Sequence, residues 1–223
     1  SNAGELVDAV RERCGVEIKV ISGDEEARLV HLSAWSDFGA PGQRLAVLDV
    51  GGGSTEVTWG SSAQPSGRRS FQMGAVRLTE RAGPGDPPSE ADLARLRATA
   101  RAALAEMREI QVSGHLSGAR LVGVAGTVTT LAAVAQSLPV YDAARVHGSD
   151  LGREVLLDLV ARLAALPLRE RALVPGMEPK RADVIVAGAT LVLEAMALGG
   201  FSHLTVSDRG VRWGLLHDRF GGD

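Results

Sequence analysis

The sequence has 223 residues, 45% hydrophobic and 23% charged, with a formal net charge of −3. This composition is ordinary for a globular protein, and the length allows one good-sized domain or two small ones. The charge gives no indication of nucleic-acid binding, so a polyanionic partner would need a local basic patch. A single cysteine, Cys14, excludes a disulfide framework and a cysteine zinc site, and it favours a reducing compartment, the cytoplasm. No apolar run is long enough to cross a bilayer.

Hydrophobic periodicity predicts the elements at the start of the chain. Residues 5–13 are expected to form a short helix, residues 16–22 a strand, and residues 23–35 a second helix. Residues 36–43 are rich in glycine, proline and polar residues, and they are the best candidate for a domain boundary. Residues 1–3, Ser-Asn-Ala, are interpreted as the remnant of a cleaved expression tag and are left out of the fold.

Three strands are predicted next, two of them joined by a glycine-rich turn. Residues 45–50 and 55–60 are expected to form a hairpin, and residues 69–74 a third strand. A helix is then predicted from a capping box at Ser89 to about residue 110.

The rest of the chain alternates between helices and strands. The expected elements are a buried strand at 119–126, a helix at 127–136, a helix from Val155 to Leu166, a buried helix at 181–198, a strand at 203–208 and a closing helix at 209–220. Three strands in a meander, followed by this alternation, predict an α/β domain with a mixed five-stranded sheet flanked by helices.

The hairpin turn has the composition of a phosphate site. Its sequence, DVGGGSTE over residues 49–56, places three glycines where backbone N–H groups can approach a phosphate closely. Ser54 and Thr55 add hydroxyl donors. Asp49 and Glu56 repel phosphate, and their presence is explained if a hard cation such as Mg²⁺ lies between them and the phosphate oxygens. The turn is therefore predicted to hold phosphate and a metal ion; the alternative is a glycine-rich turn with surface acids.

Three further junctions are candidates for the site. Gly126 and Thr127 lie where a strand meets a helix N-terminus, which suits an anion, but Thr127 as a simple N-cap explains the pattern equally well. Arg209 follows another strand, where it could clamp phosphate or pair with Asp208. One glutamate of SGDEEA, residues 22–27, could serve as a general base for water, although the pattern alone favours a capped helix with acids in its first turn.

Seven segments, in chain order, carry a resemblance to a known family. They are VISGDEEARLVHL, LDVGGGSTEVTWG, MGAVRLTER, GVAGTVTTLAA, RVHGSDLGRE, RADVIVAGATLVLE and TVSDRGVRWGLL. Together they closely resemble the Ppx/GppA phosphatases, which are exopolyphosphatases and guanosine pentaphosphate (pppGpp) phosphohydrolases of the actin-like ATPase superfamily. The resemblance runs from about Glu5 to the end of the chain. It implies a ribonuclease-H-like fold, Mg²⁺ or another divalent cation, and polyphosphate or pppGpp as substrate.

The resemblance also implies roles for individual residues. Residues 49–56 fall on the family's second phosphate loop, which binds the terminal phosphates together with a metal held by Asp49 and Glu56. Glu26 falls on the glutamate proposed to activate the attacking water, which reverses the interpretation from pattern alone, and Glu25 is expected to be the more solvated of the two. Water attack on the terminal phosphorus would release orthophosphate. The candidate phosphate ligands are Gly51, Gly52, Gly53, Ser54, Thr55, Gly126, Thr127 and Arg209.

The chain departs from the family pattern in two respects. The family's first Asp-Gly-rich hairpin has no counterpart, so residues 4–40 are interpreted as the tail of a missing N-terminal half with an interdomain segment, and residues 41–223 as the C-terminal ribonuclease-H-like phosphate-binding domain. The strand at 16–22 would then be exposed, mispaired or swapped, which allows a homodimer and leaves the activity of the trimmed chain open. Ala125 stands where the family usually has glycine, and its methyl group could crowd a ligand.

A long polyanion needs a basic track, and binding to it would depend on salt. Candidates that flank the motifs are Arg68, Arg69, Arg77, Lys180, Arg181, Arg209 and Arg212. The sequence leaves two functions to weigh: a Mg²⁺-dependent phosphohydrolase, or a non-catalytic phosphate- or nucleotide-binding sensor. Glu26 discriminates between them, because a sensor needs no general base. A sugar kinase is disfavoured, since SGDEEARL and MGAVRLTE have no place in it.

Overall fold

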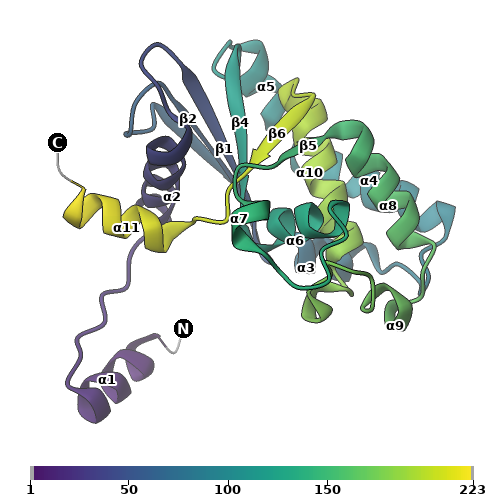
Figure 1. Ribbon diagram of the computed structural model, residues 1–223, viewed down its shortest axis with the longest axis horizontal. Coiled ribbons are helices and arrows are strands. Elements are labelled where there is room, and N and C mark those ends of the chain that lie inside the picture. The colour runs from purple at the N-terminus through teal and green to yellow at the C-terminus, as the bar shows by residue number, and fades with distance from the viewer. Residues whose placement is uncertain (1–2, 222–223) are drawn as a thin grey trace.

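A mixed sheet of six strands forms the middle of the molecule, in the order β3-β2-β1-β4-β6-β5 (Figure 1). β1, β4 and β6 pair in parallel, whereas β2, β3 and β5 join the sheet through antiparallel pairs. The strands are β1 (Arg44–Val50), β2 (Thr55–Gly60), β3 (Gly67–Phe71), β4 (Ala119–Val124), β5 (Asp150–Gly152) and β6 (His203–Val206). This computed structural model describes residues 3–221, so Ser1 and Asn2 of the expected tag remnant lie outside the described residues.

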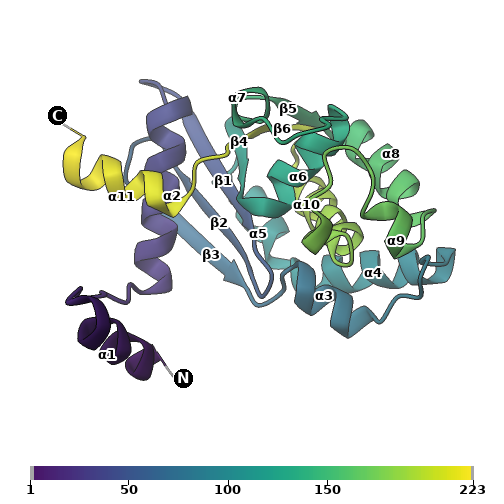
Figure 2. The same cartoon turned by 60° about the horizontal axis from the view of Figure 1, so that its bottom comes forward.

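Helices cover both faces of the sheet (Figures 1 and 2). On one face, α2 (Gly23–Phe38) packs against β1 and β2, and α11 (Val211–Phe220) packs against α2. The other helices after β3 are α3 (Ala75–Ala82), α4 (Glu90–Ala103), α5 (Glu106–Val112), α6 (Ala125–Ala135), α7 (Ala143–Val146), α8 (Arg153–Ala164), α9 (Leu168–Arg171) and α10 (Ile185–Gly199). No helix of the described residues is long and apolar enough to span a membrane.

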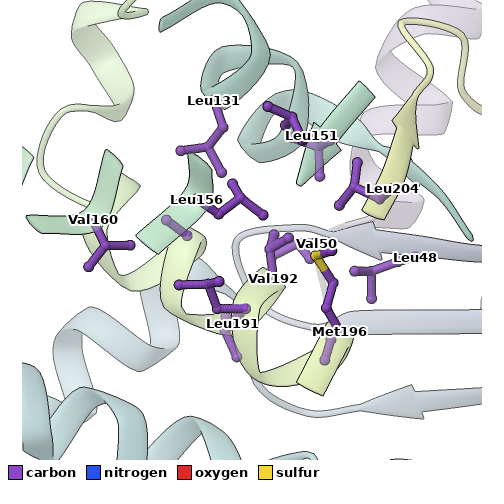
Figure 3. Packing of buried hydrophobic residues seen from close by; sticks show 14 of the residues in the cluster. Leu48, Val50, Leu131, Leu151, Leu156, Val160, Leu191, Val192, Met196 and Leu204 are labelled. Carbon is purple, nitrogen blue, oxygen red and sulfur yellow. The ribbon is translucent and has the colours of Figure 1, made fainter. Parts of the chain in front are cut away.

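The sheet buries its two faces in separate hydrophobic clusters. Side chains alternate along a strand, so Leu48 and Val50 of β1 point to one face and Val47 points to the other. Leu48 and Val50 lie in the large cluster beside Val192 of α10 (Figure 3). Val47 lies in the smaller cluster with Val30 of α2. This second cluster fixes α2 on the sheet, and α2 is the helix that carries the predicted general base.

The predicted strand at residues 16–22 is wrong. These residues form no regular structure, and Val16, Ile18 and Val20 are exposed. They connect the body of the molecule to α1 (Ala3–Cys14), which lies apart from the sheet and its helices in both views (Figures 1 and 2). An alternating pattern forms a strand only where a neighbouring strand is present to pair with it.

Two further predictions differ from the structure in detail. The sheet has six strands instead of five, because β5 is only three residues long and buries a single apolar side chain, that of Leu151. The helix predicted from Ser89 to about residue 110 is broken at Leu104 into α4 and α5. The other predicted helices and strands are confirmed, with ends that shift by a few residues.

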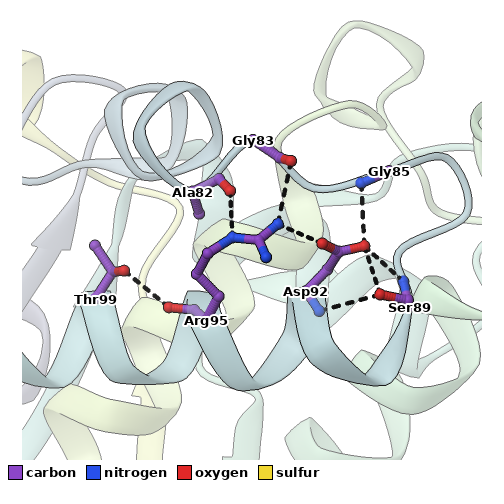
Figure 4. A network of polar contacts seen from close by, with 7 residues as sticks. All are labelled: Ala82, Gly83, Gly85, Ser89, Asp92, Arg95 and Thr99. Atoms are coloured by element: carbon purple, nitrogen blue, oxygen red, sulfur yellow. Dashed lines mark hydrogen bonds and ion pairs between the residues drawn. The ribbon is translucent and has the colours of Figure 1, made fainter.

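The predicted capping box at Ser89 is confirmed, and it belongs to a wider network (Figure 4). The carboxylate of Asp92 accepts hydrogen bonds from the N–H groups of Ser89 (2.9 Å) and Gly85 (3.2 Å). Arg95 pairs with Asp92 and donates to the carbonyl of Ala82 (2.6 Å). The hydrogen bonds from Ser89 hold the pKa of Asp92 well below its usual range. The network joins the end of α3 to the start of α4.

Candidate active site

A cavity of about 430 Å³ lies between the first turn of α2 and the sheet at β1, β2 and β3. Asp49 of β1 shares the α2 face with Val47, because residues two apart on a strand point the same way. Glu56 is the direct neighbour of Asp49 in the register of β1 and β2. Both carboxylates line the cavity, and Glu26 of α2 lines it from the other side. The structure therefore brings together three acids that lie in two separate segments of the sequence.

The three acids repel one another across this cavity. Burial raises the pKa of Asp49 to about 7, and the negative charges of Glu56 and Glu26 add to this effect. Ser70 of β3 donates a hydrogen bond to Glu56 (2.8 Å), which holds that carboxylate against the sheet. Carboxylates crowded in this way are the ligands that a hard divalent cation prefers. The residues present therefore fit Mg²⁺.

The protein supplies only part of a coordination shell at this place. Within residues 3–221, no group of three or more His, Cys, Asp or Glu side chains is arranged to hold a metal ion. Asp49 and Glu56 offer two carboxylates, and Mg²⁺ is commonly held by one or two carboxylates together with waters and phosphate oxygens. The arrangement suits a cation that binds together with a phosphate group.

The loop between β1 and β2 presents an open face to solvent. Gly52 and Gly53 are exposed, and among the described residues their N–H groups have no protein acceptor. The carbonyls of Gly51 and Gly52 accept hydrogen bonds from the first N–H groups of α3 (2.9 and 3.0 Å). The N–H of Gly51 donates to the carbonyl of Ser54 (3.0 Å), which leaves the N–H groups of Gly52 and Gly53 to bind an anion. Such an open face is what the predicted phosphate site requires.

Two residues support the site without having been predicted. Ser70 orients Glu56, and nothing in the sequence indicated which residue of β3 would lie opposite Glu56. Gly74 lets the glycine loop approach α3, because a Cβ atom at Gly74 would lie 2.4 Å from the carbonyl carbon of Gly52. The segment MGAVRLTER of the resemblance contains Gly74, so its importance could have been inferred from that segment.

Of the neighbouring acids Glu25 and Glu26, only Glu26 lines the cavity. Glu25 is held by Arg28, which donates two hydrogen bonds to its carboxylate (2.8 Å each). The expectation that Glu25 is the more solvated of the two is wrong, because Glu25 is half-buried in this ion pair whereas Glu26 is exposed. The choice of Glu26 as the acid that faces the site agrees with this geometry.

Of the predicted phosphate ligands, Gly51 and Ser54 line this cavity, and Thr55, Thr127 and Arg209 are engaged elsewhere in the structure. Thr55 is buried, and its hydroxyl donates to the carbonyl of Met73 (2.7 Å). Thr127 is buried inside the first turn of α6, so it is not the N-cap of that helix. Arg209 pairs with Asp37 at the C-terminal end of α2, and not with the residue that precedes it. Their roles in phosphate binding stay predictions.

A second cavity, of about 760 Å³, lies at the start of α6. Gly126 lines it together with Lys180 and Arg181 of a short 3-10 helix (Pro179–Arg181). A Cβ atom at Gly126 would lie 2.0 Å from the guanidinium group of Arg181, so glycine leaves room for that side chain. The preceding residue, Ala125, has a φ of 69°, in the left-handed region that favours glycine. The glycine that the resemblance implies at this position would adopt this backbone conformation without strain.

Some of the basic residues predicted for a polyanion track are held by ion pairs or hydrogen bonds within the protein, and others are not. The engaged ones are Arg68 with Asp24, Arg69 with Glu106, Arg77 with the Gln72 carbonyl, and Arg209 with Asp37. The ion pairs of the described residues include none made by Lys180, Arg181 or Arg212. Lys180 and Arg181 line the second cavity, but Glu178, Asp183 and Asp208 line it too, so its charge is mixed and the track stays a prediction.

Comparison with known proteins identifies the family of this chain. The sequence profile of the Ppx/GppA phosphatase family matches residues 1–221. The chain belongs to the Ppx/GppA phosphatase family. Exopolyphosphatase 2 of Mycobacterium tuberculosis is 39% identical over 208 residues, which cover 90% of this chain and 63% of that protein. Exopolyphosphatase 1 of Mycobacterium bovis is 31% identical, over 96% of this chain and 62% of that protein. This Ppx/GppA chain thus spans less than two thirds of the length of these relatives.

Solved structures of Ppx/GppA proteins share its fold. The crystal structure of the Aquifex aeolicus family member matches with a TM-score of 0.86 at 30% identity, over 98% of this chain and 69% of that one. An exopolyphosphatase from Cytophaga hutchinsonii matches with a TM-score of 0.83 at 25% identity, over 97% of this chain and 70% of that one. The predicted actin-like, ribonuclease-H-like α/β fold is therefore confirmed.

Proposed function

We propose that this Ppx/GppA chain is the phosphate-binding part of an exopolyphosphatase, which releases orthophosphate from the end of polyphosphate or from pppGpp. The observation that carries the proposal is the cavity that places Glu26, Asp49 and Glu56 beside an open glycine loop. Relatives named exopolyphosphatase support the choice of reaction. The alternative, a non-catalytic phosphate- or nucleotide-binding module, explains the loop but gives no reason for Glu26.

In this proposal, the loop at residues 51–54 binds the terminal phosphate through its free N–H groups. Asp49 and Glu56 would hold Mg²⁺, which when bound would neutralise the charge of the phosphate oxygens. Glu26 accepts a proton from the attacking water, whose oxygen forms a bond to the terminal phosphorus. The terminal anhydride P–O bond breaks, orthophosphate leaves, and the shortened chain keeps the bridging oxygen.

Three further assignments belong to this proposal. The first is the division of the chain into residues 4–40, the tail of an N-terminal half, and residues 41–223, the C-terminal domain, with a homodimer as one form of the protein. The exposed, unpaired thiol of Cys14 supports a reducing, cytoplasmic setting. A long polyanion as the substrate is supported by the relatives named exopolyphosphatase, with Lys180 and Arg181 as candidate contacts in a cavity of mixed charge.

Orthophosphate release in the presence of Mg²⁺, from long-chain polyphosphate and from pppGpp, tests the proposal. Glu26→Gln should lower kcat by about 10²- to 10⁴-fold, because the amide cannot accept the proton of the water. Glu25→Gln is the matched control. It removes the same charge one residue away, outside the cavity, and should change kcat by less than about twofold.

Two results would contradict the proposal. Release that persists in Glu26→Gln, or falls equally in both variants, would remove the assigned base. An unsubstituted chain that binds polyphosphate but releases nothing from either substrate would favour the binding module.

A further inference from the structure

Arg68, one of the residues predicted for the polyanion track, faces the cavity from β3. In the register of β2 and β3, Arg68 lies opposite Thr58, and Ser70 lies opposite Glu56. Residues two apart on a strand share a face, so all four side chains face α2. Arg69 falls between Arg68 and Ser70, and its side chain reaches the other face, where it pairs with α5. Arg69 also contributes to the lining of the cavity, but Arg68 is the cation of β3 whose place on the strand shares a face with Glu56.

The partner of Arg68 is Asp24, in the first turn of α2. Asp24, Ala27 and His31 are spaced three and four residues apart, so they form one stripe along the helix. At the far end of this stripe, His31 is hydrogen-bonded to Thr58 (2.8 Å). The stripe is thus attached to the β2–β3 hairpin at two points, about two helical turns apart.

The two attachments differ in what they fix. His31 is fully buried and also bonds the carbonyl of Ser62 (3.2 Å), so it anchors the middle of α2. The side chains of Asp24 and Arg68 are 68% and 48% exposed. Among the described residues, no other side-chain hydrogen bond or ion pair joins residues 23–26 to the sheet. Within residues 23–26, this exposed pair is therefore the polar side-chain contact that joins the first turn, which carries Glu26, to the sheet.

We propose that Arg68 is a positioning residue, which acts through Asp24 to hold Glu26 over Asp49 and Glu56. The inference rests on the proposed role of Glu26 as the base. It takes Arg68 out of the polyanion track, because a guanidinium that holds Asp24 does not bind substrate phosphate. An exposed ion pair contributes little to global stability, so both partners can be replaced without unfolding the chain.

Steady-state kinetics of polyphosphate hydrolysis separate positioning from substrate binding. Arg68→Gln and Asp24→Asn should each lower kcat about three- to fivefold and leave KM unchanged, because the base is displaced in both. The exchanged pair, Asp24→Arg with Arg68→Asp, should restore kcat to within about twofold of the unsubstituted chain. A raised KM in Arg68→Gln alone, without rescue by the exchange, would show that Arg68 binds substrate and would overturn the inference.

Glu106→Gln is the matched control. It breaks the ion pair of Arg69, the next residue of β3, on the opposite face of the sheet, and it should change neither kcat nor KM. A loss of kcat in Glu106→Gln as large as in Arg68→Gln would overturn the inference, because any ion pair of β3 would then have the same effect.

Amide hydrogen exchange provides a readout that does not need catalysis. The amide hydrogens of Glu26 and Ala27 should exchange at least about threefold faster in Arg68→Gln and in Asp24→Asn than in the unsubstituted chain. In the double variant Asp24→Arg with Arg68→Asp, their rates should return to those of the unsubstituted chain. Unchanged exchange would overturn the inference, whatever the activity. An inactive chain that shows these exchange changes would contradict the proposed function and still support the attachment of the helix.

Discussion

Ala125 enters α6 with a φ of 69°, where a Cβ atom raises the conformational energy by about 1–2 kcal/mol. The next residue is Gly126, where any side chain would collide with Arg181. Backbone conformation favours glycine at position 125, whereas glycine at position 126 leaves room for the movable end of the Arg181 side chain. The chain has alanine at position 125, so it carries local strain beside the second cavity.

Ala125→Gly should therefore increase the free energy of unfolding by about 0.5–1 kcal/mol, since relief of strain exceeds the added entropy of the unfolded chain. In thermal denaturation this corresponds to a rise in Tm of about 1–4 °C. Ala132→Gly, inside α6 where the backbone conformation is ordinary, is the control and should lower Tm, because glycine there adds entropy to the unfolded chain and relieves no strain. A Tm that falls in Ala125→Gly would show that this backbone conformation carries no strain.

Among the elements, α2 brings the proposed base to the sheet, and His31 attaches it there. The carbonyl of Ser62 can only accept a hydrogen bond, so Nε2 of His31 carries the proton and Nδ1 accepts from the hydroxyl of Thr58. Burial lowers the pKa of His31 to about 4, and the bond to Ser62 only partly offsets this effect. A neutral ring is therefore part of the contact between α2 and β2.

This contact should make the stability of the chain sensitive to acid. The folded pKa of His31, about 4, lies below its ordinary value of 6.5, so the unfolded chain binds the proton first. The contribution of His31 to stability is therefore complete above 6.5 and is lost as the pH falls toward 4. His31→Gln should lower the free energy of unfolding by about 1–2 kcal/mol at neutral pH and flatten its dependence on pH in this window. Urea denaturation across the window measures both effects, and parallel curves for the two proteins would contradict the assignment.

The elements also show what the sequence could and could not predict. The buried helix α10 and the hairpin of β1 and β2 were predictable, because their apolar patterns are long and the turn at 49–56 is distinctive. The common face of Asp49 and Glu56 followed from alternation along a hairpin. The contact of Ser70 with Glu56 and the pairing of Arg68 with Asp24 did not follow, because they depend on the register of β3 and on how α2 crosses the sheet. The strand expected at 16–22 failed because local pattern does not reveal whether a partner strand is present.

For the molecule as a whole, Asp49 changes the free energy of unfolding with pH in the direction opposite to that of His31. Its folded pKa of about 7 lies above the ordinary 3.8, so the folded chain keeps its proton longer, and stability falls as the pH rises through this interval. Asp49→Asn should increase the free energy of unfolding by on the order of 2 kcal/mol at about pH 8 and change it little near pH 4. Mg²⁺ at about pH 8 should raise the Tm of the unsubstituted chain, because it binds the folded state, and Asp49→Asn should abolish that rise.

Asp158→Asn serves as the control for this measurement. It removes a carboxylate on the exposed side of α8, away from the cavity, and should leave both the pH dependence and the effect of Mg²⁺ unchanged. A rise in Tm with Mg²⁺ that persists in Asp49→Asn would show that the cation binds elsewhere.

The extended segment between α1 and α2 has a consequence for the integrity of the chain. Proteases cut accessible chain that can adopt an extended conformation, and residues 15–22 present such a stretch with Val16 and Val20 exposed. Cleavage there would release α1 together with Cys14, while every residue that lines the cavity would stay on the larger fragment. A nick at the end of this segment, next to Ser22, would leave the new α-amino group at the start of α2, where it would place a titratable positive charge near the proposed base.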